Sequence, residues 1–277
     1  MNKDFVLNTN KNEKIRITSY GYKNLETAPC LIFVHGFKGF KDWGFWPYSG
    51  NYFADKGFFV LTFNFSHNGI GEKLTEFTEL DKFANNTFSL ELEELNEVID
   101  AYLNNFFGAK SNKRIGIVGH SRGGGDSVIV SSKRKEISAV VIWASVVNFN
   151  RYSERQAKEW RKNGFFEVLN TRTNQMMRLN VSLLEDIERN KTDLLNLEKA
   201  VKNLNKPLLI VHGEQDLSVP IKEGEQIYNW SNKEITEFYK IEATGHTFDI
   251  THPFGGSNPK FDLVIEKTLN FFNKNLN

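Results

Sequence analysis

The stretch Gly119-His120-Ser121-Arg122-Gly123 closes an apolar, β-branched run near residues 114–119 and precedes a segment with helical character. Its G-x-S-x-G spacing is typical of a nucleophile elbow, in which a strand turns sharply into a helix and projects a serine side chain. The flanking glycines remove Cβ atoms that would clash in so sharp a turn. The stretch therefore predicts a strand–turn–helix unit with Ser121 as a nucleophile. A glycine-rich turn without chemistry is the alternative.

The rest of the chain alternates short β-branched or aromatic runs with helical patterns. The runs lie near residues 3–8, 14–20, 30–35, 58–65, 114–119, 138–145, 207–213 and 236–242. Several are continuously apolar, which is typical of strands buried on both faces of a parallel sheet. The first two runs are more polar and are expected to be exposed edge strands. This alternation predicts an α/β fold with a doubly wound sheet.

Two segments, residues 88–106 and 261–275, carry apolar side chains at helical spacing. We expect both to form amphipathic helices that pack against the sheet. The acidic residues expected outside the apolar stripe of the first helix are Glu91, Glu93, Glu94 and Asp100.

One connection is longer than the fold needs. About sixty residues separate the runs near 145 and 207, whereas a crossover between parallel strands needs only about a dozen. Capping-box patterns at Ser153–Gln156 and Ser182–Glu185 predict helix starts within it. We therefore expect residues 1–277 to form a single domain with a helical cap inserted at approximately 146–204. An ordinary solvated helical excursion is the alternative.

A serine hydroxyl is a poor nucleophile at neutral pH and needs a general base. Of the six histidines, His246 is the best candidate because it follows the last strand run at a glycine-marked turn. His252 is the rival, but the adjacent Pro253 and the polar loop around it suggest a surface turn.

The base in turn needs an acid that fixes its tautomer and stabilises the imidazolium. Asp216 lies just past the buried run near 207–213. Glu214 and Asp249 are the alternatives, and Asp249 is more simply interpreted as a helix cap or loop residue. The order Ser121, Asp216, His246 is the order that accompanies G-x-S-x-G in such sheets.

An oxyanion hole is expected beside this triad. Gly36 follows the run near 30–35 and lets the backbone turn, so that the amides of Phe37 and Arg122 donate to a tetrahedral oxyanion. A plain strand-ending turn is the alternative.

Composition and charge exclude several classes of protein. The net charge is +1, which disfavours nucleic-acid partners. The single cysteine, Cys30, forms no intramolecular disulfide, and no dinucleotide, P-loop or metal motif occurs, so we expect no cofactor and no metal. The N-terminus lacks a signal-peptide pattern, and the longest apolar-rich run, 137–149, is shorter than the ~20 residues that span a bilayer. We expect a cytoplasmic protein without membrane partners.

The motifs at 35–37 (HGF), 119–124 (GHSRGG), 213–216 (GEQD) and 245–248 (GHTF) resemble those of the α/β-hydrolase superfamily, over essentially the whole chain. Within the superfamily, the chain resembles single-domain esterases and the serine-aminopeptidase-like and dienelactone-hydrolase-like groups. It looks closest to feruloyl/cinnamoyl esterase-like members. The resemblance implies an eight-stranded, mostly parallel sheet with the second strand antiparallel, helices on both faces, and acyl transfer without metal or cofactor. Dienelactone-type relatives would be expected to use cysteine at the elbow, so the serine found here favours the esterases.

Aromatic residues near the expected site suggest an apolar pocket. The candidate pocket residues are Trp43, Trp46, Trp160, Phe165 and Met176.

The predicted function is that of a serine carboxylesterase acting on small to medium esters, including hydroxycinnamoyl-type ones, through an acyl-enzyme on Ser121. A serine aminopeptidase or amidase with the same triad is the first alternative, and a ligand-binding receptor with vestigial hydrolysis is the second. The expected partner is a small-molecule ester, and the chain is expected to be a monomer or a homodimer.

Overall fold

The computed structural model describes residues 2–276, and its central feature is an eight-stranded sheet in the order β1-β2-β4-β3-β5-β6-β9-β10. The strands of this sheet are β1 (Lys3–Asn8), β2 (Lys14–Tyr20), β3 (Cys30–Val34), β4 (Phe59–Asn64), β5 (Ile115–His120), β6 (Ile137–Trp143), β9 (Leu208–Gly213) and β10 (Thr236–Ile241). β2 is antiparallel to both of its neighbours, and all other neighbouring pairs are parallel. The predicted strands and the predicted antiparallel second strand are thus confirmed. The expectation of two exposed edge strands holds for β1 and is wrong for β2, which lies between β1 and β4 and is mostly buried.

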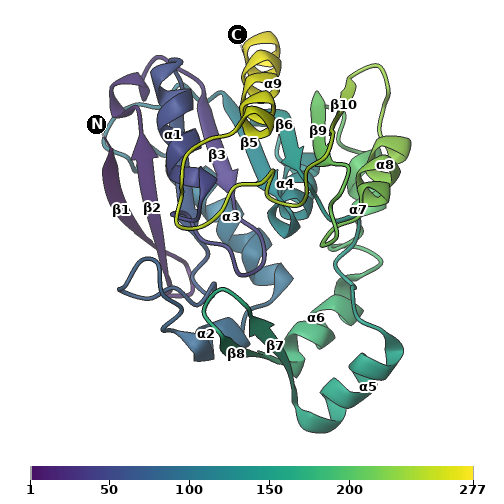
Figure 1. The fold of residues 1–277 in the computed structure, drawn as a ribbon. Helices are drawn as coiled ribbons and strands as arrows, with labels where there is room; N and C mark the ends of the chain where they lie inside the picture. Colours follow the sequence, from purple (N-terminus) through teal and green to yellow (C-terminus); the bar gives the residue numbers. More distant parts are fainter. Residues whose placement is uncertain (1, 277) are drawn as a thin grey trace.

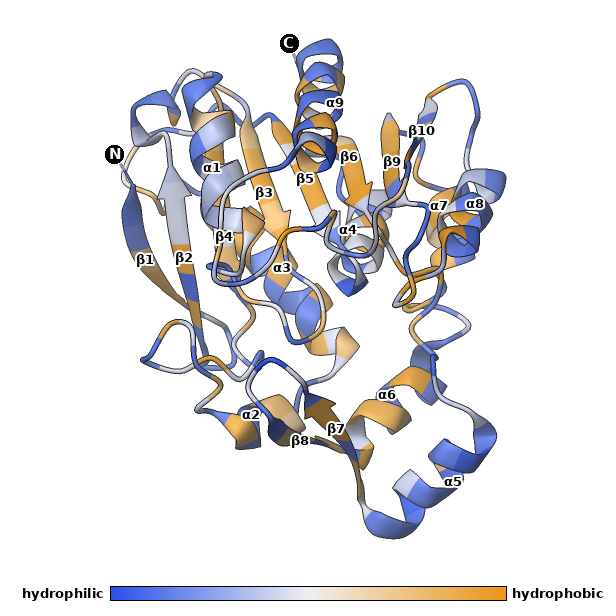
Figure 2. Cartoon of the chain, viewed as in Figure 1, coloured by the Kyte–Doolittle hydropathy of each residue, from blue (hydrophilic) through white to orange (hydrophobic). Residues whose placement is uncertain are grey.

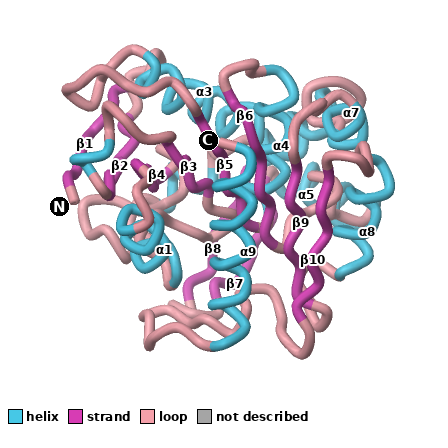
Figure 3. Tube along the Cα trace, turned by 90° about the horizontal axis from the view of Figure 1, so that it is seen from above, coloured by secondary structure: helices cyan, strands magenta, loops and turns pink. Residues whose placement is uncertain are grey.

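Helices cover both faces of the sheet (Figure 1). They are α1 (Phe45–Asp55), α2 (Leu80–Ala84), α3 (Phe88–Leu103), α4 (Arg122–Lys133), α5 (Glu154–Asn163), α6 (Val181–Asn190), α7 (Leu197–Lys202), α8 (Ile221–Trp230) and α9 (Pro259–Asn275), with a 3-10 turn at Tyr22–Asn24. Seen from above, α1 and α9 lie on one side of the sheet, and α3, α4 and α7 lie on the other (Figure 3).

The central strands form the hydrophobic core. β3, β4, β5 and β9 are buried along their whole length. In the interior of the molecule, β3, β5, β6 and β9 are coloured strongly hydrophobic (Figure 2). A strand covered by helices on both faces has no solvent side, which explains why these runs are continuously apolar. None of the helices described within residues 2–276 is both long and apolar enough to cross a membrane.

The two predicted amphipathic helices are present with shifted ends. α3 begins at the Thr87 cap, whose side chain accepts a hydrogen bond from the Leu90 amide, and it ends at Leu103. The predicted end at 106 is wrong because Asn105 adopts a left-handed conformation that stops the helix. α9 begins two residues earlier than predicted because the Asn258 side chain caps the amides of Lys260 and Phe261.

The long connection between β6 and β9 contains strands as well as helices. β7 (Phe165–Asn170) and β8 (Gln175–Asn180) form an antiparallel hairpin between α5 and α6. Along β8, Met177 and Leu179 are buried while Met176 and Arg178 are exposed, a period-two pattern that the helical interpretation missed. This hairpin lies with α5 and α6 beyond the carboxyl ends of the central strands (Figure 1).

One of the two predicted capping boxes is present. The Ser153 side chain accepts from the Gln156 amide, and the Gln156 side chain accepts from the Ser153 amide. The second is wrong, because α6 starts at Val181 and Ser182 therefore lies inside the helix. Strand β8 runs directly into α6, and the Val181 amide is already held by the carbonyl oxygen of Gly164.

Two carboxylates on α3 do not lie where the helical pattern placed them. Glu91 and Glu94 are both buried, although the sequence pattern put them outside the apolar stripe. Glu94 accepts hydrogen bonds from the Ser66 amide at 2.9 Å and from the Ser66 hydroxyl. Burial nevertheless raises the pKa of Glu94 to about 7.

We expect Glu94→Gln to become relatively more stable than the wild type as the pH rises. Because the pKa of Glu94 in the folded state lies above its ordinary value of 4.5, the folded protein holds this proton between pH 4.5 and about 7, and the wild type loses stability across that window. The difference in unfolding free energy should change by about 2 kcal/mol between pH 5 and pH 8. Urea unfolding of the wild type and of Glu94→Gln at pH 5 and pH 8 measures this difference. Glu93→Gln, an exposed change on the same helix, should show no such trend, and equal trends in both variants would contradict the assignment.

Candidate active site

Ser121 lies in a strained turn between β5 and α4. Its φ of 57° and ψ of −121° are unusual for a non-glycine residue. A Cβ on Gly119 would lie 2.2 Å from the Gly123 carbonyl oxygen, and a Cβ on Gly123 would lie 2.5 Å from the His35 carbonyl oxygen. Neither position can hold a side chain, so the two glycines of the motif permit the turn that projects Ser121.

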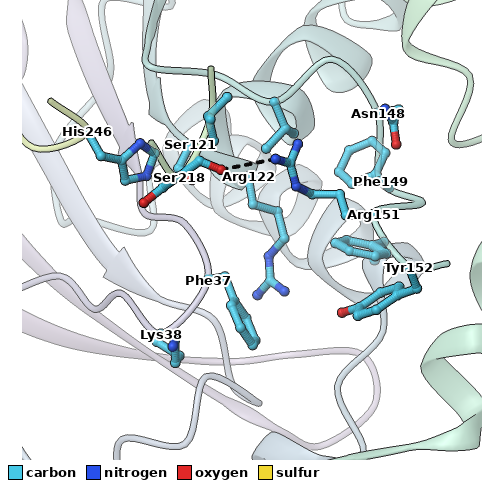
Figure 4. A pocket seen from close by; sticks show the side chains of 13 residues that line it. Phe37, Lys38, Ser121, Arg122, Asn148, Phe149, Arg151, Tyr152, Ser218 and His246 are labelled. Atoms are coloured by element: carbon cyan, nitrogen blue, oxygen red, sulfur yellow. Dashed lines mark hydrogen bonds between the residues drawn. The ribbon is translucent and has the colours of Figure 1, made fainter. Parts of the chain in front are cut away.

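His246 is held next to this turn. It lies in the loop after β10, and its ring centroid is 4.6 Å from that of His120, the residue before Ser121. His120 Nε2 also donates a hydrogen bond to the His246 carbonyl oxygen at 2.9 Å. Ser121 and His246 line the same cavity (Figure 4). Within the described residues no hydrogen bond joins their side chains, and such bonds in ligand-free enzymes often tighten only when substrate binds.

Asp216 holds the imidazole of His246. His246 Nδ1 donates to Asp216 Oδ2 at 2.7 Å, and the amides of Ser218 and Val219 each donate to Asp216 Oδ1 at 2.8 Å. The side chain is buried, and burial alone would raise its pKa. His212, whose Nε2 lies 3.5 Å from Asp216 Oδ2, and the hydrogen bond with His246 outweigh this effect and hold the pKa of Asp216 below its ordinary value. The carboxylate is therefore charged at neutral pH and oriented by two backbone donors.

Neither alternative acid accepts a hydrogen bond from His246 within residues 2–276, and the alternative base has contacts of its own. Glu214 is exposed, and Asp249 accepts hydrogen bonds from Thr244 Oγ1 at 2.8 Å and Lys260 Nζ at 3.0 Å. His252 Nδ1 accepts from the Gly44 amide at 3.1 Å, and its ring stacks on an aromatic neighbour. The expectation that His252 lies in a surface turn fits its loop, which bends at His252 between exposed residues, although this packing half-buries the ring.

The segment after β3 lies directly against the elbow. A Cβ on Gly36 would lie 2.9 Å from Ser121 Cβ and 3.3 Å from the Arg122 nitrogen, so only glycine allows this approach. Neither the Phe37 amide nor the Arg122 amide has a hydrogen-bond acceptor within residues 2–276. Two free N–H donors thus belong to segments that meet beside Ser121.

A buried ion pair anchors the start of α4. Arg122 Nη2 donates to Glu91 Oε1 at 2.6 Å, and Asn86 Nδ2 donates to the same oxygen at 2.7 Å. The Arg122 guanidinium also lies 4.9 Å from the Phe37 ring centroid. Sequence reasoning missed this role for Glu91. The only sequence signal for this role is the position of Glu91 among the apolar residues of the helix.

Two cavities open at Ser121 and His246. The first, of about 340 Å³, is lined by aromatic residues, among them Phe37, Phe149 and Tyr152 (Figure 4). The second, of about 330 Å³, is lined in part by Trp43, Trp46, Asn170 and Arg172. Within residues 2–276, no group of three or more histidine, cysteine, aspartate or glutamate side chains could hold a metal ion.

Only two of the five expected pocket residues reach a cavity. Trp43 and Trp46 line the second cavity, whereas Trp160, Phe165 and Met176 line neither. Trp160 is 0% exposed and packs on Tyr152, and Met176 is 53% exposed to solvent. Phe165 lies under the guanidinium of Arg178, whose carbon is 4.3 Å from the ring centroid. The expectation that these three side chains line the site is wrong, because they pack within the insertion or face solvent.

Comparisons with known proteins give a family and a fold. The sequence profile of the prolyl oligopeptidase family matches residues 43–277. No curated protein matches this sequence.

Three solved structures illustrate the structural likeness. The α/β hydrolase GrgF from Penicillium sp. sh18 is 15% identical with a TM-score of 0.75, over 100% of this chain and 99% of that one. Est1E from Butyrivibrio proteoclasticus, solved with ferulic acid bound, is 18% identical with a TM-score of 0.73, over 98% of both chains. The esterase Pf2001 from Pyrococcus furiosus is 20% identical with a TM-score of 0.65, over 100% of this chain and 92% of that one. At these identities the likeness shows the fold, and the predicted α/β-hydrolase fold is confirmed.

Proposed function

Because the chain belongs to the prolyl oligopeptidase family and is a hydrolase with the α/β-hydrolase fold, we propose that it is a serine carboxylesterase acting through an acyl-enzyme on Ser121. The observation that carries the proposal is the arrangement of three side chains. Asp216 holds His246 by a hydrogen bond of 2.7 Å, and His246 and Ser121 line one cavity.

The proposed reaction starts with proton transfer from Ser121 Oγ to His246 Nε2. Ser121 Oγ then attacks the ester carbonyl carbon, and the amides of Phe37 and Arg122 donate to the tetrahedral oxyanion. Asp216 stabilises the imidazolium, which passes its proton to the departing alcohol. A water molecule, deprotonated by His246, hydrolyses the acyl-enzyme and restores the free serine.

The cavities support small to medium substrates, including aromatic ones. Volumes of about 340 and 330 Å³ suit a small organic ester, and the aromatic side chains of Phe37, Phe88, Phe149 and Tyr152 offer stacking surfaces. Est1E has been solved with ferulic acid bound, and we extend hydroxycinnamoyl-type esters to this chain as candidates. Tyr152 and Arg172 lie in the segment 146–204, which supports the proposal that this segment caps the site.

Peptide or amide hydrolysis is the second candidate, and the family match is the observation that favours it. An aminopeptidase needs an acidic group near the nucleophile to bind the substrate ammonium. No aspartate or glutamate of the described residues lines either cavity, whereas Lys38, Arg122, Arg151 and Arg172 do. A lining without an acidic group among the described residues therefore favours the esterase over an aminopeptidase.

A side-by-side panel tests the proposal. It compares p-nitrophenyl acetate and butyrate, methyl ferulate, and aminoacyl p-nitroanilides at equal enzyme concentration. We expect kcat/KM for at least one ester to exceed that for every anilide by 100-fold or more. A preference for anilides would favour the amidase, and no turnover of any compound would favour a binding protein and overturn the esterase.

A further inference from the structure

The second cavity is surrounded by hydrogen-bond donors and positive charge that the proposed reaction does not use. Lys38 and Arg172 line it from opposite segments, the loop after β3 and the turn between β7 and β8. Asn170 and Trp43 line it as well. The lining includes Ser121 and His246, so whatever binds there lies beside the reacting atoms.

The two cations have no acidic partner among residues 2–276. Lys38 Nζ donates to the Leu169 carbonyl oxygen at 3.1 Å, and Arg172 Nη2 donates to the Lys38 carbonyl oxygen. These contacts neutralise no charge and leave other N–H donors of both groups free. Burial, and then the positive charge of Arg172, lower the pKa of Lys38.

The other cations near Ser121 are already paired. Arg122 lies 2.6 Å from Glu91, and Arg151 lies 2.7 Å from Glu223. The positive charge that remains uncompensated is therefore confined to the side of the site occupied by Lys38 and Arg172.

Two residues that line the same cavity each carry a buried donor without a partner among residues 2–276. Asn170 is 1% exposed; its Oδ1 accepts from the Arg172 amide at 3.3 Å, but its Nδ2 has no acceptor within residues 2–276. Trp43 Nε1 is likewise buried without an acceptor. A buried donor left unpaired is costly, and an acceptor group that reached either side chain from the cavity would relieve that cost.

We propose that the second cavity binds a carboxylate or similar oxyanion group of the substrate, so that the favoured substrates are esters with a negatively charged arm. The inference rests on the proposed esterase function and names its substrate class. A carboxylate accepts several hydrogen bonds and matches the planar fork of a guanidinium. Because Ser121 faces both cavities, the ester bond would lie between them, with the anionic arm near Arg172 and the apolar part against Phe149.

Matched pairs of substrates test this. The acyl-side pair is p-nitrophenyl hydrogen glutarate against p-nitrophenyl valerate, and the alcohol-side pair is 4-acetoxybenzoate against its methyl ester. We expect the wild type to prefer the anionic member of one pair by at least about tenfold in kcat/KM. That preference should fall about tenfold in Arg172→Gln and in Lys38→Met, and it should weaken in about 0.5 M salt.

Arg178→Gln is the matched control. Arg178 lies on the same hairpin but outside both cavities, against Glu167 and Phe165, so its removal should leave the preference unchanged. An equal loss in Arg178→Gln would indicate a general charge effect and would overturn the inference. Efficient turnover of neutral esters without any anionic preference would overturn the inference and leave the esterase standing.

A binding measurement tests the anion site even if the protein hydrolyses none of these esters. Calorimetry with Ser121→Ala protein compares monomethyl glutarate with methyl valerate. Binding of the anion that weakens about tenfold on adding Arg172→Gln supports the site, whereas no binding of the anion overturns it.

Discussion

Replacing Ser121 with alanine is expected to lower p-nitrophenyl ester turnover by about 10⁴–10⁶-fold, because members of a nucleophilic triad act as a unit. The change removes only Oγ and keeps the Cβ, so the backbone at φ 57° has the same steric demands as before. Ser121 Oγ makes no hydrogen bond within the described residues, so its loss should not disturb the fold. Steady-state kinetics measures the loss of turnover, and a thermal melt shows whether the fold is intact.

Ser132→Ala is the matched control for this variant. Ser132 lies on the same helix, and its hydroxyl donates only to the Ile129 carbonyl oxygen at 2.7 Å. Its turnover should stay close to that of the wild type. A loss below tenfold in Ser121→Ala, with the fold intact, would contradict the role given to Ser121.

Asp216→Asn is expected to lower kcat by about 10⁴-fold, because it favours the wrong imidazole tautomer. Two backbone N–H groups point at Oδ1, so the amide oxygen of the new asparagine must take that position. Its NH2 group then faces His246 Nδ1, which can accept a hydrogen bond only when it is unprotonated. The proton moves to Nε2, and the imidazole can no longer accept a proton from Ser121.

Kinetics of two further variants separate this effect from a general loss of charge. Glu214→Gln and Asp249→Asn each remove a nearby carboxylate that does not contact His246. Both should stay within about threefold of the wild type. A large loss in Asp249→Asn with little loss in Asp216→Asn would transfer the role of the acid to Asp249.

The features that sequence predicted well are those determined by local sterics or by burial on both faces of a strand. The elbow at Ser121 depends on glycines at 119 and 123, where a Cβ would collide with neighbouring backbone. The strands follow the apolar runs because a covered parallel strand has no polar face. The Ser153 capping box also depends on only four consecutive residues.

The features that sequence missed depend on contacts between distant segments. Glu91 is buried because Arg122, from another helix, pairs with it. The hairpin around Asn170 follows a period-two pattern too short to distinguish from a helix without its partner strand. The insertion places Arg172 beside Lys38, and no local pattern indicates that the residues at 38 and 172 would share a cavity.

Labelling with a fluorophosphonate probe, followed by peptide mass spectrometry, tests the central role of Ser121 most directly. Such probes react preferentially with a serine that is activated by a base and faces an oxyanion site. We expect one adduct, on the peptide that contains Ser121, and its loss in His246→Ala. An adduct on another residue, or no adduct on the folded wild-type protein, would contradict the account.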